Sequence, residues 1–180
     1  MKASPANKNS SVYPVASVVK DLTASQAASP PQIAQVRELF LEYAQSLGFS
    51  LCFQGFDREL AELPGDYTPP QGRLFLAECQ NEECQTELAG CVALHKLDIE
   101  TCEMKRLYLR QHFRGRGFGR ALAEAVIAEA RSIGYRRMRL DTVAPTMKDA
   151  VALYRQLGFV EIAPYRTNPI EGALYMELKL

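Results

Sequence analysis

The sequence carries no excess of charge and no long apolar run. Its 21 lysines and arginines balance 21 aspartates and glutamates over 180 residues, so no whole-molecule field attracts nucleic acid or an anionic membrane. No apolar stretch reaches the roughly 18 residues that a membrane-spanning helix needs, and the amino-terminal MKASPANKNSS lacks the apolar run of a signal peptide. We therefore expect a cytoplasmic protein without a nucleic-acid or membrane partner, in which any basic function is local.

Side chains that bind transition metals are also scarce. The two histidines are His95 and His112, and the cysteines form an odd set without a CxxC pair: Cys52, Cys79, Cys84, Cys91 and Cys102. The spacing of Cys79 and Cys84 is loose for a zinc site, and two histidines offer little to complete one. We expect no metal, and we interpret the cysteines as free thiols of a reducing compartment.

The length and the 47% share of hydrophobic residues suit one domain with a sizeable core. We predict a flexible tail over residues 1–10 and a single domain over 11–180. Residue patterns predict strands at 12–19, 73–79, 87–97, 102–110, 136–143, 159–163 and 172–180, and helices at 31–47, 57–63, 117–133 and 146–157, with a loop at 64–72. Hairpin-linked strands followed by strand–helix–strand units indicate an α/β (α+β) fold, a mixed central sheet of about six to seven strands with helices on both faces.

A glycine-rich turn stands between the strand at 102–110 and the helix at 117–133. In RGRGFGR, three glycines alternate with other residues directly before an alanine-rich helical pattern. A helix start of this kind offers unpaired amides and the positive end of the helix dipole to an anion, and glycine lets a phosphate approach the backbone closely. The chain lacks a Walker A loop, and the dinucleotide pattern GxGxxG fails at Arg120 and Leu122.

The pattern that does fit is Arg114-x-x-Gly117-x-Gly119, preceded by KRLYLRQHF and followed later by AVALYRQLGFVEI. With these neighbours the chain resembles the GCN5-related N-acetyltransferases, the GNAT family, over about Leu74 to Leu180. The resemblance implies the GNAT fold and a site for the cosubstrate acetyl-CoA, whose pyrophosphate the loop amides hold. It assigns the coenzyme to Leu107, Tyr108, Leu109, Arg114, Gly115, Arg116, Gly117, Phe118, Gly119, Arg120 and Met147. Many relatives have asparagine where this chain has Met147.

Acetyl transfer to an amine needs a base for the ammonium proton and an acid for the departing thiolate. The resemblance implies that Glu103 is the base and Tyr154 the acid. Alternation along the strand puts Glu103 on one face with Lys105, Leu107 and Leu109, and apolar neighbours would raise its pKa. In the alternative interpretations, Glu103 is a salt-bridged carboxylate and Tyr154 a core aromatic.

The resemblance places the acceptor between residues 48–72 and 164–172. These segments carry Asp57, Arg58, Glu59, Glu62, Asp66, Tyr67, Tyr165, Arg166 and Asn168. Asp141 and Thr142 either face the cleft or cap the following helix. We expect the primary amine of a small molecule as acceptor, and a homodimer is possible. The alternatives are an acetyltransferase that acts on a protein or peptide amine, a coenzyme-binding sensor or interaction module that has lost turnover, and a binding protein for another phosphorylated ligand.

Overall fold

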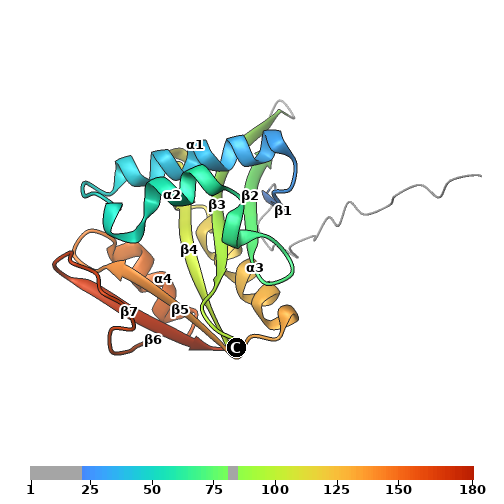
Figure 1. Ribbon diagram of the computed structural model, residues 1–180. Helices are drawn as coiled ribbons and strands as arrows, with labels where there is room; N and C mark the ends of the chain where they lie inside the picture. Colours follow the sequence, from blue (N-terminus) through green and yellow to red (C-terminus); the bar gives the residue numbers. More distant parts are fainter. Residues whose placement is uncertain (1–21, 81–84) are drawn as a thin grey trace, which may run out of the picture.

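The computed structural model describes residues 22–80 and 85–180 (Figure 1). Seven strands form one mixed sheet in the order β1-β2-β3-β4-β5-β7-β6, which confirms the predicted fold class. The strands are β1 (Leu22–Gln26), β2 (Arg73–Gln80), β3 (Thr86–Lys96), β4 (Thr101–Leu109), β5 (Arg137–Val143), β6 (Val160–Glu161) and β7 (Ala173–Lys179). The α-helices are α1 (Pro30–Ser46), α2 (Phe56–Glu62), α3 (Phe118–Ile133) and α4 (Lys148–Gln156). The strand expected at 12–19 and the tail at 1–10 lie outside the described residues.

The helices cover the two faces of the sheet and produce two apolar cores (Figure 1). On one face α1 and α2 bury Val36, Phe40 and Phe56 against strands β2 and β3. On the other face α3 contributes Phe118 and Leu122 to a larger core, which also receives side chains from α4. The expected loop at 64–72 includes a 3₁₀ turn (Gly65–Tyr67) that packs Tyr67 into the first core.

Strand β4 contains a β-bulge at Arg106, and this bulge overturns part of the predicted strand alternation. Arg106 has φ +54°, and the pairing of β3 with β4 shifts register between Cys91 and Ala93. An extra residue in one strand reverses the side-chain alternation beyond it. Arg106 therefore points toward α2, as Lys105 does, whereas Leu107 and Leu109 pack into the α3 core. The prediction that Leu107 and Leu109 share a face with Glu103 was wrong for this reason.

Glycine at position 90 in β3 permits the close approach of the two strands beside the bulge. A Cβ atom at Gly90 would lie 2.1 Å from the carbonyl oxygen of Tyr108. Real Cβ atoms do not approach a backbone oxygen so closely, and no flexible side chain can yield at that contact. The irregular course of β4 therefore depends on the absence of a side chain on its neighbour.

Candidate active site

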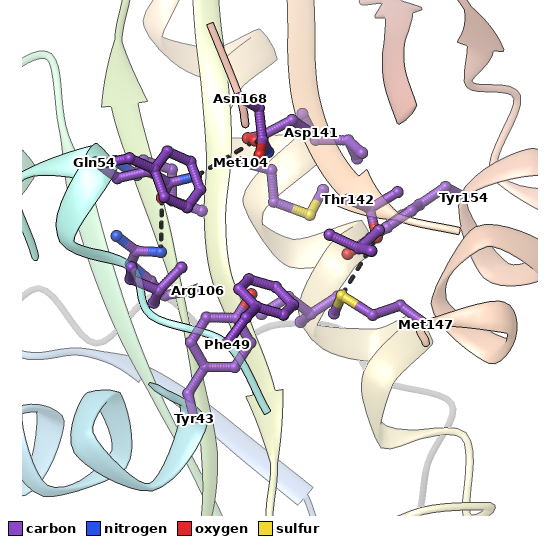
Figure 2. Close-up of a pocket in the computed structure, with 16 residues that line it drawn as sticks. Tyr43, Phe49, Gln54, Met104, Arg106, Asp141, Thr142, Met147, Tyr154 and Asn168 are labelled. Carbon is purple, nitrogen blue, oxygen red and sulfur yellow. Dashed lines mark hydrogen bonds between the residues drawn. The ribbon is translucent and has the colours of Figure 1, made fainter. Parts of the chain in front are cut away.

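The sheet opens between β4 and β5, and this gap forms the candidate site. The two parallel strands pair only from Thr101–Arg137 to Glu103–Arg139. Above that point lies a cavity that is partly open to solvent, which we call the central cavity (Figure 2). Its wall is made by side chains from α1, the segment after α1, β4, β5, α4 and the loop before β7: Tyr43, Phe49, Leu51, Phe53, Gln54, Met104, Lys105, Arg106, Leu107, Leu140, Asp141, Thr142, Val143, Met147, Tyr154 and Asn168.

The glycine-rich turn lies at the end of β4 and forms the start of α3, as the sequence predicted. Gly115 and Gly117 have φ +74° and +83°, which favour glycine, and Gly117 is the N-cap of α3. No side chain of the described residues caps this helix, so its first amides are available to an acceptor from outside. Gly119 packs beside Leu109 and Leu153, which sets the turn against α4.

The three arginines of the turn differ in how they are held. The Nε of Arg114 donates to the carbonyl oxygen of Leu109 at 3.0 Å, and the guanidinium of Arg120 reaches Glu124 and Gln156. The guanidinium of Arg116 lies over the ring of Phe118, 4.6 Å from its centroid. All three head groups thus line the exposed turn while resting on the protein, and none is a fully solvated charge.

For several of the residues that the resemblance assigns to the coenzyme, only the backbone is available to contact a ligand. The side chains of Leu109 and Phe118 are buried in the α3 core. Tyr108 lies on the opposite face, with its ring 6.0 Å from that of Tyr43. Among the assigned residues of β4, only Leu107 contributes to the wall of the central cavity.

Tyr154 stands in the wall of the central cavity, on α4 (Figure 2). Tyr154 is 6% exposed, and its hydroxyl has no hydrogen-bond partner in the described part of the chain. Burial, with smaller contributions from Tyr43 and Asp141, raises the pKa of Tyr154. The hydroxyl therefore keeps its proton at neutral pH and is free to donate it into the cavity.

Met147 lies beside Tyr154 and precedes α4. Its sulfur accepts a hydrogen bond from Thr142 Oγ1 at 3.4 Å (Figure 2). Thr142 thus faces the cavity rather than capping α4, whose N-terminus receives no side-chain cap from the described residues. The position that is often asparagine in GNAT relatives is here an apolar part of the wall.

Glu103 is fully buried and does not line the central cavity. Its Oε1 accepts hydrogen bonds from the Tyr165 hydroxyl at 2.6 Å and from Arg166, and its Oε2 lies 3.6 Å from Nδ1 of His95. Burial by itself would raise the pKa of Glu103, but the polar contact with His95, the charges of Arg166 and Lys105 and the Tyr165 hydrogen bond together hold it below the usual value. The predicted rise in pKa was wrong, because the neighbours are cations and donors rather than apolar side chains.

Asp141 faces the central cavity, in agreement with one of the two expectations for this residue. It shares the guanidinium of Arg166 with Glu103 and accepts hydrogen bonds from Asn168 at 2.8 Å and from Gln54 at 3.3 Å. Gln54 in turn accepts from Arg106 at 3.0 Å (Figure 2). This network connects β4, β5 and the segment after α1 across the gap.

A second cavity, which we call the acceptor cavity, opens beside the first. Lys105 and His95 from the sheet contribute to its wall. So do six residues from the segments that the resemblance assigned to the acceptor: Arg58, Glu59, Glu62, Asp66, Tyr67 and Arg166. Asp57 does not line it, and Tyr165 is turned toward Glu103. The sequence did not indicate that His95 and Lys105 line this cavity, since the pairing of β3 with β4, with His95 opposite Glu103, brings them together.

Within residues 22–80 and 85–180, no helix has the length and apolar character needed to cross a membrane. The same residues hold no group of three or more metal-ligating side chains.

Comparison with known proteins agrees with this geometry. The model of the acetyltransferase (GNAT) family matches residues 33–159. An N-acetyltransferase of Schizosaccharomyces pombe is 38% identical over 161 residues, which cover 89% of this chain and 96% of the relative. An acetyltransferase structure from Streptococcus agalactiae has a TM-score of 0.70 at 20% identity, covering 89% of this chain and 99% of that one. A GNAT structure from Elizabethkingia anophelis with acetyl-CoA bound has a TM-score of 0.64 at 22% identity, covering 89% and 99%. The family match and the curated relative show that the chain belongs to the GNAT family of acetyltransferases.

Proposed function

We propose that the protein transfers the acetyl group of acetyl-CoA to the primary amine of a small molecule. The observation that carries the proposal is the glycine-lined start of α3, which no described side chain caps and which packs through Gly119 against α4, the helix that carries Tyr154. Acetyl-CoA carries its phosphates and its thioester at different ends of one molecule. The helix start suits the phosphates, and the hydroxyl of Tyr154 suits the thioester. The bound acetyl-CoA in the Elizabethkingia anophelis relative supports the same cosubstrate.

In this proposal the turn binds the coenzyme mainly through its backbone. The amides from Arg114 to Arg120 would hold the pyrophosphate, because both positive-φ glycines keep side chains away from it. The arginines would add charge to the phosphates. Amides of the Leu107–Leu109 segment would polarise the thioester carbonyl, and Met147 would contact the coenzyme through its side chain.

The amine nitrogen, once the ammonium has lost its proton, attacks the carbonyl carbon of the thioester, and the carbon–sulfur bond breaks. We propose that Tyr154 gives its proton to the departing thiolate, for which its raised pKa keeps it protonated. The second proton that the nitrogen loses as the amide forms would restore the hydroxyl of Tyr154 after this residue has protonated the sulfur. The ammonium proton of the acceptor would pass to Glu103. Because Glu103 lines neither cavity, the proton would travel to it through water.

Calorimetric titration with acetyl-CoA, CoA and dephospho-CoA tests the proposal. We expect both intact coenzymes to bind and the loss of the 3′-phosphate to weaken binding. Failure of the folded protein to bind acetyl-CoA would overturn the proposal. Binding without release of free thiol with any amine would instead favour an inactive coenzyme sensor. The described cysteines are free thiols, and we place the enzyme in the reducing cytoplasm.

A further inference from the structure

Lys105 is a largely buried lysine that has no hydrogen bond in the part of the chain that the structure describes. Its side chain is 12% exposed, and its ion pair is with Glu59, at 3.8 Å. Burial, partly offset by Glu59, lowers its pKa. Removing an ammonium group from water is costly unless close partners replace the water.

The carboxylates around Lys105 are already engaged by other donors. Glu59 receives two hydrogen bonds from Arg106, at 2.9 and 2.6 Å, and a third from the Tyr67 hydroxyl at 2.6 Å. Glu103 and Asp141 share the guanidinium of Arg166. Three carboxylates thus face three cations, and Lys105 is the cation of this group left without a close partner.

Lys105 also occupies the junction of the two cavities. Its side chain contributes to the walls of both the central cavity and the acceptor cavity. Asp141 and Tyr154 line only the central cavity, whereas His95 and Arg166 line only the acceptor cavity. Lys105 and Gln54 are the described residues that line both cavities, and of the two only Lys105 carries a charge that could bind an anionic group of a ligand.

We propose that the acceptor is an α-amino acid, whose carboxylate binds Lys105 while its amine faces Asp141 in the central cavity. This inference rests on the proposed acetyltransferase function and names its substrate class. In an α-amino acid the carboxylate and the amine are bonded to the same carbon atom. Lys105 at the junction suits the carboxylate, and Asp141 in the central cavity suits the amine. The amino-acid side chain would lie in the acceptor cavity, among Tyr67, His95 and Arg166. The substrate carboxylate would supply the close partner that Lys105 lacks.

The experiment compares acceptors that differ only at the carboxylate. Purified protein with saturating acetyl-CoA is given L-leucine, L-leucinamide or 3-methylbutylamine, and likewise L-phenylalanine, L-phenylalaninamide or 2-phenylethylamine, and free thiol is measured. The amides control for amine basicity, because their amines lose a proton more readily than those of the amino acids. We expect kcat/KM for the better amino acid to exceed that of its amide and its amine by about 10- to 100-fold, the range for a hydrogen bond to a charged group.

Two lysine variants then locate the effect. Lys105→Met should reduce kcat/KM for the amino acid by about 10- to 100-fold and leave the amide and amine nearly unchanged, and Lys105→Arg should recover part of the loss. Lys96→Met is the matched control, since Lys96 pairs with Gln71 and lines neither cavity. It should leave the preference intact.

The outcomes separate this inference from the proposed function. If acetyl-CoA binds and the amides or amines are acetylated as well as the amino acids, or better, the inference is overturned while the acetyltransferase function stands. It is also overturned if acetyl-CoA binds but none of the amino acids is acetylated, or if Lys105→Met keeps the preference. Failure to bind acetyl-CoA in calorimetry overturns the proposed function itself. If Lys105→Met does not fold, the wild-type comparison still decides.

Discussion

The hydroxyl of Tyr165 donates a 2.6 Å hydrogen bond to Oε1 of Glu103 and so attaches the loop before β7 to the centre of the sheet. The next residue, Arg166, extends the same connection to Asp141. A buried carboxylate thereby holds one wall of the acceptor cavity. Ionisation of Glu103 should consequently affect both stability and catalysis.

We expect Glu103→Gln to lower the free energy of unfolding by about 3 kcal/mol at neutral pH, because it removes one partner of a buried charged pair. The folded-state pKa of Glu103 is lowered, so its contribution is present above the ordinary glutamate pKa of about 4.3 and is lost as pH falls through the lower folded-state value. Denaturant titrations from about pH 7 to about pH 3 should show the difference from wild type shrinking in acid. Glu161→Gln, at a surface pair with Arg155, is the control and should change little.

The same variant tests the proposed base. If Glu103 receives the amine proton, Glu103→Gln should lower kcat and remove the acidic limb of the pH–rate profile. An unchanged profile with normal kcat would assign Glu103 to structure alone.

Tyr154→Phe should reduce kcat by about 100-fold, since it removes the proposed proton donor to the thiolate. Stability should stay close to wild type, because the Tyr154 hydroxyl has no partner among the described residues to lose. Tyr135→Phe is the matched control: its hydroxyl donates to the Gln71 carbonyl at 2.9 Å. That variant should lose about 1 kcal/mol of stability and keep its kcat. Wild-type turnover in Tyr154→Phe would exclude the acid role.

Gly117→Glu should weaken acetyl-CoA binding by about 100-fold in calorimetry, because it places a negative charge where we propose that the phosphates bind. Any side chain at φ +83° is strained, so Gly117→Ala is needed to measure the strain alone. We expect the alanine variant to bind considerably more tightly than the glutamate variant. Equal affinities for the two would argue against a phosphate at this turn.

Gly90→Ala should lower the free energy of unfolding by about 2 kcal/mol or more, since the new Cβ would meet the Tyr108 carbonyl at 2.1 Å. Gly119→Ala provides the contrast within the same chain. A Cβ at Gly119 would make only ordinary contacts, at 3.6 Å or more, within a helix that favours alanine. Thermal denaturation should therefore show loss in the first variant and none in the second.

Local patterns were sufficient to predict most of the fold. Hydrophobic periodicity and turn residues located the helices and strands from 31 to 180 to within a few residues, and the glycine-rich turn was found at the start of α3. The parallel contact of β4 and β5 follows from the strand–helix–strand pattern. These features depend on neighbours in sequence, which a single sequence displays.

The chemistry of the buried carboxylate was not predictable in the same way. Arg166 meets Glu103 across 63 positions of sequence, and His95 reaches it through cross-strand pairing. The bulge at Arg106 is equally invisible in the residue pattern, because it is a feature of how β4 pairs with β3, whose close approach Gly90 permits. Interactions between distant segments therefore decided which side chains face the cavities and how Glu103 titrates.

The short seam between β4 and β5 has a mechanical consequence. Three residue pairs connect these strands, whereas β5 and β7 pair along seven. The sheet therefore consists of two well-paired parts, β1–β4 and β5–β7–β6, that are joined along a short stretch of one edge. Hydrogen bonds of Gln54 and Arg166 connect the two parts across the gap. A slight rotation of one part relative to the other would widen the gap and leave the hydrogen bonds between strands within each part intact. Under the proposed function, such a rotation would admit acceptors of different bulk by moving the side chains of Gln54 and Arg166, without any strand being rebuilt.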